Sequence, residues 1–118
     1  MDKKYNSIDL PVNFKVKLML YNDEPTFSVG VISLLELIEK YGSLNKACKE
    51  MSMAYSKGLR ILRRAENDLG FKLVEGTVGG VNGGGSKLTD EGKLFYDFYI
   101  ELDNKLKEFT NQFLKHKA

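Results

Sequence analysis

The stretch that decides the fold is residues 43–69, which read SLNKACKEMSMAYSKGLRILRRAENDL. Apolar side chains recur at helical spacing on both sides of Ser52-Met53-Ala54, which predicts two helices joined by a tight turn. All three arginines of the chain lie in one window of five residues on the second helix: Arg60, Arg63 and Arg64. Because a guanidinium can bind phosphate or guanine through two hydrogen bonds, this layout indicates a helix-turn-helix whose second helix meets nucleic acid.

The positive charge is concentrated around this helix pair. Residues 43–72 carry seven basic and three acidic side chains, a balance of +4, whereas the whole chain of 118 residues has a net charge of +2. A charged face of a helix is often simply solvated, so the charge alone does not separate a DNA-binding surface from an ordinary pair of helices. The segments around the pair decide between these readings.

The segments before the helix pair show two different periods. Residues 12–20 alternate apolar and mostly polar side chains, which predicts a half-buried strand that ends at the turn residues 22–25. Residues 28–41 have the spacing of a helix, with Gly42 suited to its C-terminal end and Ser43 to the N-cap of the next helix. The two helices of the pair are expected at residues 44–51 and 54–69.

A hairpin is predicted directly after the helix pair. Residues 71–75 read as a short strand, residues 79–85 as a glycine-rich loop, and Ser86-Lys87-Leu88 as an antiparallel return strand. A strand-loop-strand in this position is the wing of a winged helix-turn-helix. The predicted fold class is therefore mainly α with a small β component: a winged helix-turn-helix with an N-terminal strand and a long C-terminal dimerisation helix.

The last helix is expected at about residues 90–114, with Thr89 as its N-cap. Its large apolar side chains are spaced 3, 4, 4, 3 and 4 residues apart, close to the 3.5-residue period of a packed helical seam. A domain of this size has no obvious partner of its own for the far end of such a helix, so we predict a homodimer. The predicted interface residues are Phe95, Phe98, Leu102, Leu106, Phe109 and Phe113.

The expected partner is double-stranded DNA. In a winged helix-turn-helix the second helix enters the major groove and the wing runs over the adjacent backbone. The first-turn side chains would then meet base edges, the arginines bases or phosphates, and the wing phosphates. The predicted DNA-binding residues are Ser43, Ala54, Tyr55, Ser56, Lys57, Arg60, Arg63, Arg64, Gly83, Gly84, Ser86 and Lys87.

The composition favours a soluble cytoplasmic protein without enzymatic activity. No apolar run approaches the roughly 20 residues of a membrane span, and the charged start of the chain is not followed by the apolar core of a signal peptide. With only Cys48 and His116 as soft ligands, we expect no disulfide, no metal and no catalytic set. We expect a flexible tail at residues 1–10 and a single domain at residues 11–118.

The helix pair and the wing resemble a known family. Residues 42–51, GSLNKACKEM, followed by residues 53–57, MAYSK, are similar to the N-terminal DNA-binding domain of molybdate-dependent transcriptional regulators. The glycines of the loop, followed by Leu88-Thr89 and Gly92, match the wing and helix start of that family. The likeness covers about residues 27–102, and extends more distantly to LysR-type regulators.

The resemblance implies a winged helix-turn-helix that binds DNA as a homodimer, with its last helix in the dimer interface. It also implies recognition-helix positions for Ala54, Tyr55, Ser56, Lys57 and Arg60. The family often has glycine where this chain has Ser52 and serine where it has Ala54, which affects base specificity more than fold. The family's C-terminal oxyanion-binding domains are missing, so we expect no bound molybdate and no cofactor.

Three alternative functions stay open. One is a protein-interaction module that keeps the fold but no longer binds DNA specifically. Another is a regulator that responds to a small molecule or a metal held at the dimer interface. The glycine loop also has the spacing of the first part of a nucleotide-binding loop, but Ser86-Lys87 inverts the Lys-Ser/Thr order that such a loop requires.

Overall fold

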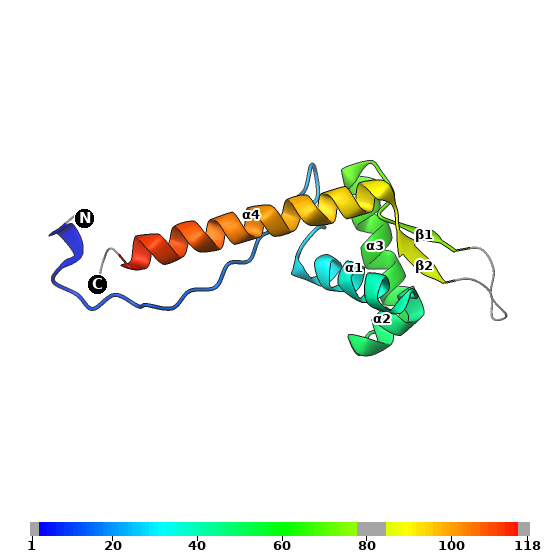
Figure 1. The fold of residues 1–118 in the computed structure, drawn as a ribbon, viewed down its shortest axis with the longest axis horizontal. Helices are drawn as coiled ribbons and strands as arrows, with labels where there is room; N and C mark the ends of the chain where they lie inside the picture. Colours follow the sequence, from blue (N-terminus) through cyan, green and yellow to red (C-terminus); the bar gives the residue numbers. More distant parts are fainter. Residues whose placement is uncertain (1–2, 78–84, 116–118) are drawn as a thin grey trace.

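The computed structural model describes residues 3–77 and 85–115. Four α-helices and a two-stranded antiparallel sheet follow one another along the chain (Figure 1). Their bounds are η1 (Lys3–Tyr5), α1 (Val29–Tyr41), α2 (Leu44–Glu50), α3 (Tyr55–Leu69), β1 (Val74–Gly76), β2 (Ser86–Leu88) and α4 (Asp90–Lys115). η1, a short 3-10 helix, lies within the predicted tail.

The molecule is elongated, with extents of 65 × 27 × 21 Å. Helices α1, α2 and α3 and the start of α4 form a body at one end, and the rest of α4 projects away from it (Figure 1). The pair β1–β2 extends from the opposite side of this body, as a wing would. The predicted fold class, mainly α with a small β wing and a long last helix, is confirmed.

The core lies where α1, α2 and α3 meet the first turns of α4. Phe27, which precedes α1, is fully buried and its ring meets that of Phe95 edge-on, with ring centroids 4.6 Å apart. Tyr99 is also buried, and its hydroxyl donates to the carbonyl oxygen of Leu18 at 2.6 Å. The first turns of α4 are therefore part of the body, and only the later turns leave it.

Local sequence signals set the ends of the helices as expected. Gly42 ends α1 in the left-handed conformation, with φ of 66°. The Ser43 hydroxyl caps α2 by accepting from the Lys46 N–H at 3.2 Å, and the Thr89 hydroxyl caps α4 by accepting from the Gly92 N–H at 2.8 Å. Ala54, at the N-cap of α3, makes no side-chain cap.

The predicted N-terminal strand is wrong as stated. Within the described residues, residues 12–19 belong to no strand, and Leu20 makes only an isolated antiparallel bridge to Phe27. The side chains still alternate as in a strand, because Val16, Leu18 and Leu20 are half-buried while Lys15, Lys17 and Met19 are exposed. The two-residue period predicted the direction of the side chains, but a strand also needs a neighbouring backbone.

Candidate nucleic-acid interface

The turn between α2 and α3 places the two helices of the motif in close contact. Ser52 has φ of 53° in this turn, a left-handed conformation that suits glycine better. Gly58 then lies directly against Cys48 of α2, and a Cβ added at Gly58 would overlap the Cys48 sulfur. Burial raises the pKa of the Cys48 thiol. Ala47 of α2 is buried as well, and the sequence analysis did not identify the contact at Gly58.

The outer face of α3 carries the predicted recognition residues. Leu62 and Ala65 anchor the helix in the core, so the residues between them turn outward. Tyr55, whose ring the apolar spacing also allowed in the core, is 49% exposed. Every predicted DNA-binding side chain of this helix is exposed: Tyr55, Ser56, Lys57, Arg60, Arg63 and Arg64.

The three arginines differ in their surroundings. Arg64 lies 3.6 Å from the carboxylate of Glu24, with both side chains about two-thirds exposed. Within the described residues, neither Arg60 nor Arg63 has a carboxylate within salt-bridge distance. Arg60 and Arg63 are therefore the guanidinium groups with their charge uncompensated, while that of Arg64 is partly balanced by its neighbour.

A carboxylate at the end of α3 fixes the segment that carries Glu24. Asp68 accepts three backbone N–H bonds, from Asn22 at 2.6 Å and from Asp23 and Glu24 at 2.8 Å each. These bonds stabilise the charged carboxylate and lower the pKa of Asp68. The turn at residues 22–25 is thereby held against the C-terminal end of α3, which brings Glu24 to Arg64.

The wing is attached directly to the turn between α1 and α2. The Ser86 N–H donates to the Gly42 carbonyl oxygen at 2.9 Å, and the Leu44 N–H donates to the Ser86 hydroxyl at 3.4 Å. A Cβ added at Gly85 would overlap the same Gly42 oxygen. The structure thus gives Ser86 a positioning contact within the chain, which the sequence analysis missed when it assigned this residue to DNA alone.

The other predicted wing residues divide into two groups. Lys87 is exposed on β2 and lies 3.6 Å from Glu75, its partner in the β1–β2 register. Gly83 and Gly84 lie outside the described residues, as does most of the predicted glycine loop. Ser43 is half-buried at the N-cap of α2, next to the base of the wing.

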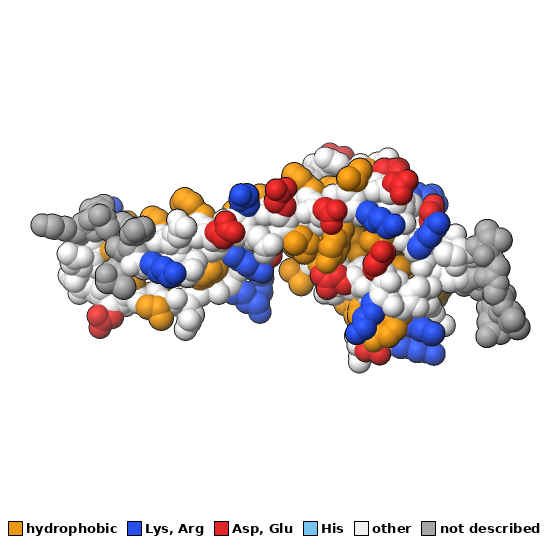
Figure 2. All heavy atoms as spheres, viewed as in Figure 1, with side chains coloured by type: hydrophobic (Ala, Val, Ile, Leu, Met, Phe, Trp, Pro, Cys, Tyr) orange, Lys and Arg blue, Asp and Glu red, His pale blue; other side chains and the backbone are white. Residues whose placement is uncertain are grey.

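Charge is unevenly distributed over the surface. On the face seen in Figure 2, Lys and Arg side chains gather on the lower part of the body, where Figure 1 places α2. Lys46 and Lys49 are exposed on that helix and follow its N-cap at Ser43. A basic face across two helices is the footprint expected of a surface that contacts a phosphate backbone.

The predicted dimer seam on α4 divides into buried and exposed parts. Phe95 turns into the body, where its ring packs against Phe27 and Phe71, so its contacts are largely within its own chain. Leu94, not predicted, is 70% exposed instead. The remaining seam residues form an exposed or half-buried apolar stripe with Leu94: Phe98, Leu102, Leu106, Phe109 and Phe113.

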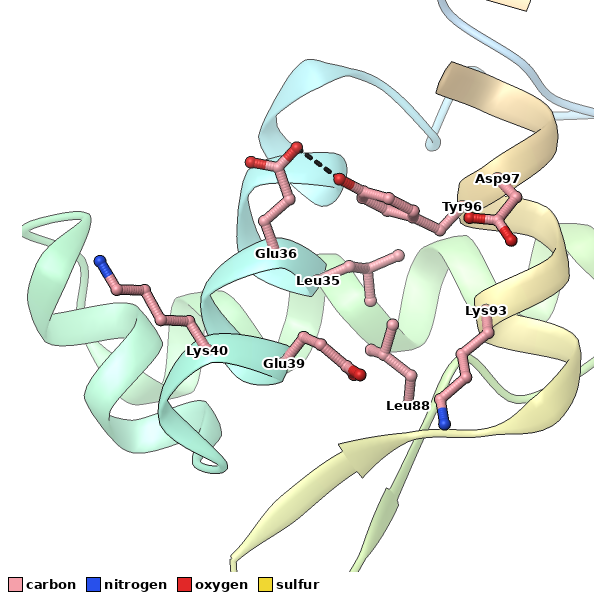
Figure 3. Close-up of a pocket in the computed structure, with 8 residues that line it drawn as sticks. All are labelled: Leu35, Glu36, Glu39, Lys40, Leu88, Lys93, Tyr96 and Asp97. Carbon is pink, nitrogen blue, oxygen red and sulfur yellow. Dashed lines mark hydrogen bonds between the residues drawn. The ribbon is translucent and has the colours of Figure 1, made fainter. Parts of the chain in front are cut away.

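An open pocket of about 450 Å³ lies between α1, β2 and α4 and is lined by no residue of α3 (Figure 3). Leu35 and Leu88 form its floor, and the Tyr96 hydroxyl donates to the Glu36 carboxylate at 2.8 Å. Burial and this carboxylate raise the pKa of Tyr96 to about 12. The bond joins α4 to α1, and none of the predicted site residues lines the pocket.

The part of the chain that the structure describes has neither a cluster of metal ligands nor a helix suited to a membrane. No group of three or more His, Cys, Asp or Glu side chains there is placed to hold a metal ion. Among the helices of that part of the chain, none combines the length and apolar character that crossing a bilayer requires.

Two curated relatives are similar to the chain in sequence, although no protein-family model matches it. The molybdenum transport protein ModE of Azotobacter vinelandii is 36% identical over 72 residues, which are 61% of this chain and 27% of that protein. The ModE of Herbaspirillum seropedicae is 30% identical over 80 residues, 68% of this chain and 30% of that protein. The predicted resemblance to molybdate-dependent regulators is confirmed, and the chain spans less than a third of these relatives' length.

Solved structures show the same fold. The BenM DNA-binding domain bound to benA site 1 DNA superposes with a TM-score of 0.53 and 21% identity, covering 75% of this chain and 94% of that one. The same domain bound to catB site 1 DNA gives a TM-score of 0.52, also at 21% identity, covering 75% and 93%. The described chain therefore shares the winged-helix fold of these domains.

Proposed function

We propose that this protein is a sequence-specific DNA-binding transcriptional regulator that acts as a homodimer and has no enzymatic activity. Helix α3 enters the major groove of double-stranded DNA, and the wing lies over the neighbouring backbone. This surface takes neither a metal nor molybdate. The similarity to ModE and to DNA-bound winged helices supports the regulatory class, and the surface of α3 supports the mode of binding.

The observation that carries the proposal is the outward, uncompensated charge of Arg60 and Arg63 on a helix anchored by Leu62 and Ala65. Arg60 is the residue proposed to reach a base edge, because it lies one turn after the first turn of α3, the end nearest the groove floor. Arg63 and Arg64 are assigned to phosphates. Among these three, Arg64 must exchange Glu24 for a phosphate, so we expect it to add least to affinity.

The second half of the proposal is the homodimer. Large apolar side chains are spaced along the projecting part of α4 at intervals that a second helix can cover, and Phe109 is 70% exposed. A twofold axis between two copies would place their recognition helices in successive major grooves, roughly 34 Å apart. The operator is then expected to be a palindrome or a near-palindrome.

The experiment that tests this function is selection of bound fragments from a genomic pool, followed by titration of the enriched fragments at several salt concentrations. The proposal predicts one enriched motif with twofold symmetry, and an affinity that falls steeply with salt because bound Lys and Arg displace counterions. Equal affinity for all fragments at physiological salt would favour the alternative, a protein-interaction module on a winged-helix scaffold.

A further inference from the structure

The extended segment at residues 9–19, here called the arm, has the side-chain pattern of a strand but no strand beside it. Of its even-numbered side chains, Leu10, Val16 and Leu18 are half-buried and two are exposed, while every odd-numbered side chain is exposed. Phe14 and Val16 line a depression together with Ile100 and Lys107 of α4, so the arm lies along that helix (Figure 1). The arm thus has one face on a helix and one in solvent, as in a half-buried sheet.

The backbone of the arm lacks the hydrogen bonds of a strand, although its side chains alternate as in one. Within the described residues, no backbone N–H from Asp9 to Met19 has a hydrogen-bond partner, and the only carbonyl oxygen with one is that of Leu18, which accepts from Tyr99. Val12 and Phe14 are 72% and 39% exposed at the centre of this stretch. An extended, apolar, unpaired backbone is a template for another strand.

We infer that the arm pairs with the arm of a second copy, as an antiparallel two-stranded ribbon lying across the two α4 helices. The inference rests on the proposed homodimer and adds the place where the second copy is held. In a dimer with a twofold axis, a segment crossing the axis meets itself in antiparallel orientation. The ribbon would cover more of Val12 and Phe14, which are 72% and 39% exposed in the single chain.

The sequence limits the registers that this self-pairing can take. Residues directly opposite each other point to the same face, so even-numbered residues must meet even-numbered ones. An axis through Lys15, Val16 or Lys17 would place lysine opposite lysine, which is unfavourable. Axes through Val12, Asn13 or Phe14 avoid this, and the proposed ribbon takes the one through Asn13, which places Phe14 opposite Val12.

The same axis also gives favourable side-chain pairs at the ends of the ribbon. Val16 then lies opposite Leu10, and Lys17 lies opposite Asp9 of the other copy, so apolar meets apolar and opposite charges meet. Pro11 falls in the same class of position as Asn13. Because proline has no N–H, this class must be the one whose facing residues exchange no hydrogen bonds, in which Cα atoms are about 4.5 Å apart.

This geometry is tested by disulfide formation between single cysteine variants of the full chain. Asn13→Cys places its thiol opposite its own copy, within the Cα separation that a disulfide spans. Lys17→Cys is the matched control, since its counterpart would lie roughly 27 Å away along the ribbon. The unmodified chain, whose Cys48 is 1% exposed, is the blank. Sedimentation equilibrium of each reduced variant gives its oligomeric state independently.

The expected result is a dimer in sedimentation, in which Asn13→Cys cross-links under mild oxidation at least about tenfold faster than Lys17→Cys. A dimer in which neither variant cross-links, or in which both do so equally, overturns the ribbon but leaves the homodimer standing. A monomer in sedimentation at concentrations well above those that saturate DNA overturns the homodimer and the ribbon together.

Discussion

Ser86 and Gly42 join the wing to the helix-turn-helix through a single backbone hydrogen bond of 2.9 Å. Strand β2 thereby starts on the turn that ends α1 and precedes α2. The Ser86 hydroxyl strengthens the joint by accepting from the N–H of Leu44, the first residue of α2. The wing and the N-terminus of α2 are therefore positioned as one unit, and a change at this joint is expected to affect both.

Substitution of Gly85 by alanine tests this joint. The added methyl group would overlap the Gly42 carbonyl oxygen, so either the wing or the α1–α2 turn must shift. We expect Gly85→Ala to lower the free energy of unfolding by about 1–3 kcal/mol, the usual effect of overpacking, and to weaken DNA binding. Gly76→Ala is the control, because its nearest atom would be 4.0 Å away. Equal stability of the two variants would show that the joint is not tight.

The contact between Gly58 and Cys48 predicts a coupled pair of substitutions. Gly58→Ala alone should destabilise the protein by about 2 kcal/mol, because its methyl group meets the buried Cys48 sulfur. Cys48→Ala removes that sulfur and leaves the Met53 sulfur at 3.5 Å and the residue 48 Cβ at 3.8 Å, both ordinary contacts. The free energy of unfolding in urea is measured for both single variants and the double variant. The double variant should lose less of it than the two single variants lose together. Strict additivity would contradict the proposed overlap.

The left-handed Ser52 predicts a stabilising substitution. A residue with a Cβ costs about 1 kcal/mol in this conformation, and part of the gain from glycine is offset by its freedom in the unfolded chain. Ser52→Gly should therefore raise the free energy of unfolding by about 0.5–1 kcal/mol. Ser56→Gly, in the first turn of α3, should instead lower it. A Ser52→Gly variant less stable than the parent would argue against the left-handed turn.

The contact between Asp68 and the turn at residues 22–25 predicts a dependence on pH. The pKa of Asp68 is lowered in the folded state by backbone N–H groups, so its contribution to stability is present above the pKa of the unfolded chain. That contribution is lost as the pH falls through the lowered value.

Asp68→Asn should therefore unfold at a lower temperature than the parent at neutral pH, and the difference should disappear in acid. Thermal unfolding followed by circular dichroism across this range measures both. Asp97→Asn, at an exposed carboxylate on α4, provides the control. A difference that persists unchanged in acid would show that the charge of Asp68 is not what holds the turn.

The sequence predicted most of the fold because its signals are local. The helix period, Gly42, and the caps at Ser43 and Thr89 all act within one or two turns, and the helices begin and end within one residue of the expected positions. The arm was assigned to a strand for an equally local reason. Its side chains do alternate, but strand pairing depends on a second backbone that no local pattern contains.

The candidate site was predicted less completely, because several of its features depend on tertiary contacts. The position of Gly58 against Cys48, the bond from Ser86 to Gly42, and the pairing of Arg64 with Glu24 join segments whose spatial relation the sequence does not display. Phe95 had the same seam spacing as Phe98, and its contacts with Phe27 and Phe71 depend on the tertiary structure. The one sequence signal that could have identified Gly58 is the presence of a glycine inside a predicted helix.

The central claim, that the outward face of α3 reads DNA, is tested most directly by the affinity of Arg60→Ala for a selected operator. Loss of a base contact should weaken binding by about 1–3 kcal/mol for the operator and much less for unrelated DNA, so that specificity falls. Lys105→Ala removes the same charge from an exposed position on α4 and should leave specificity unchanged. If Arg60→Ala binds the operator as tightly as Lys105→Ala does, the recognition helix does not act as proposed.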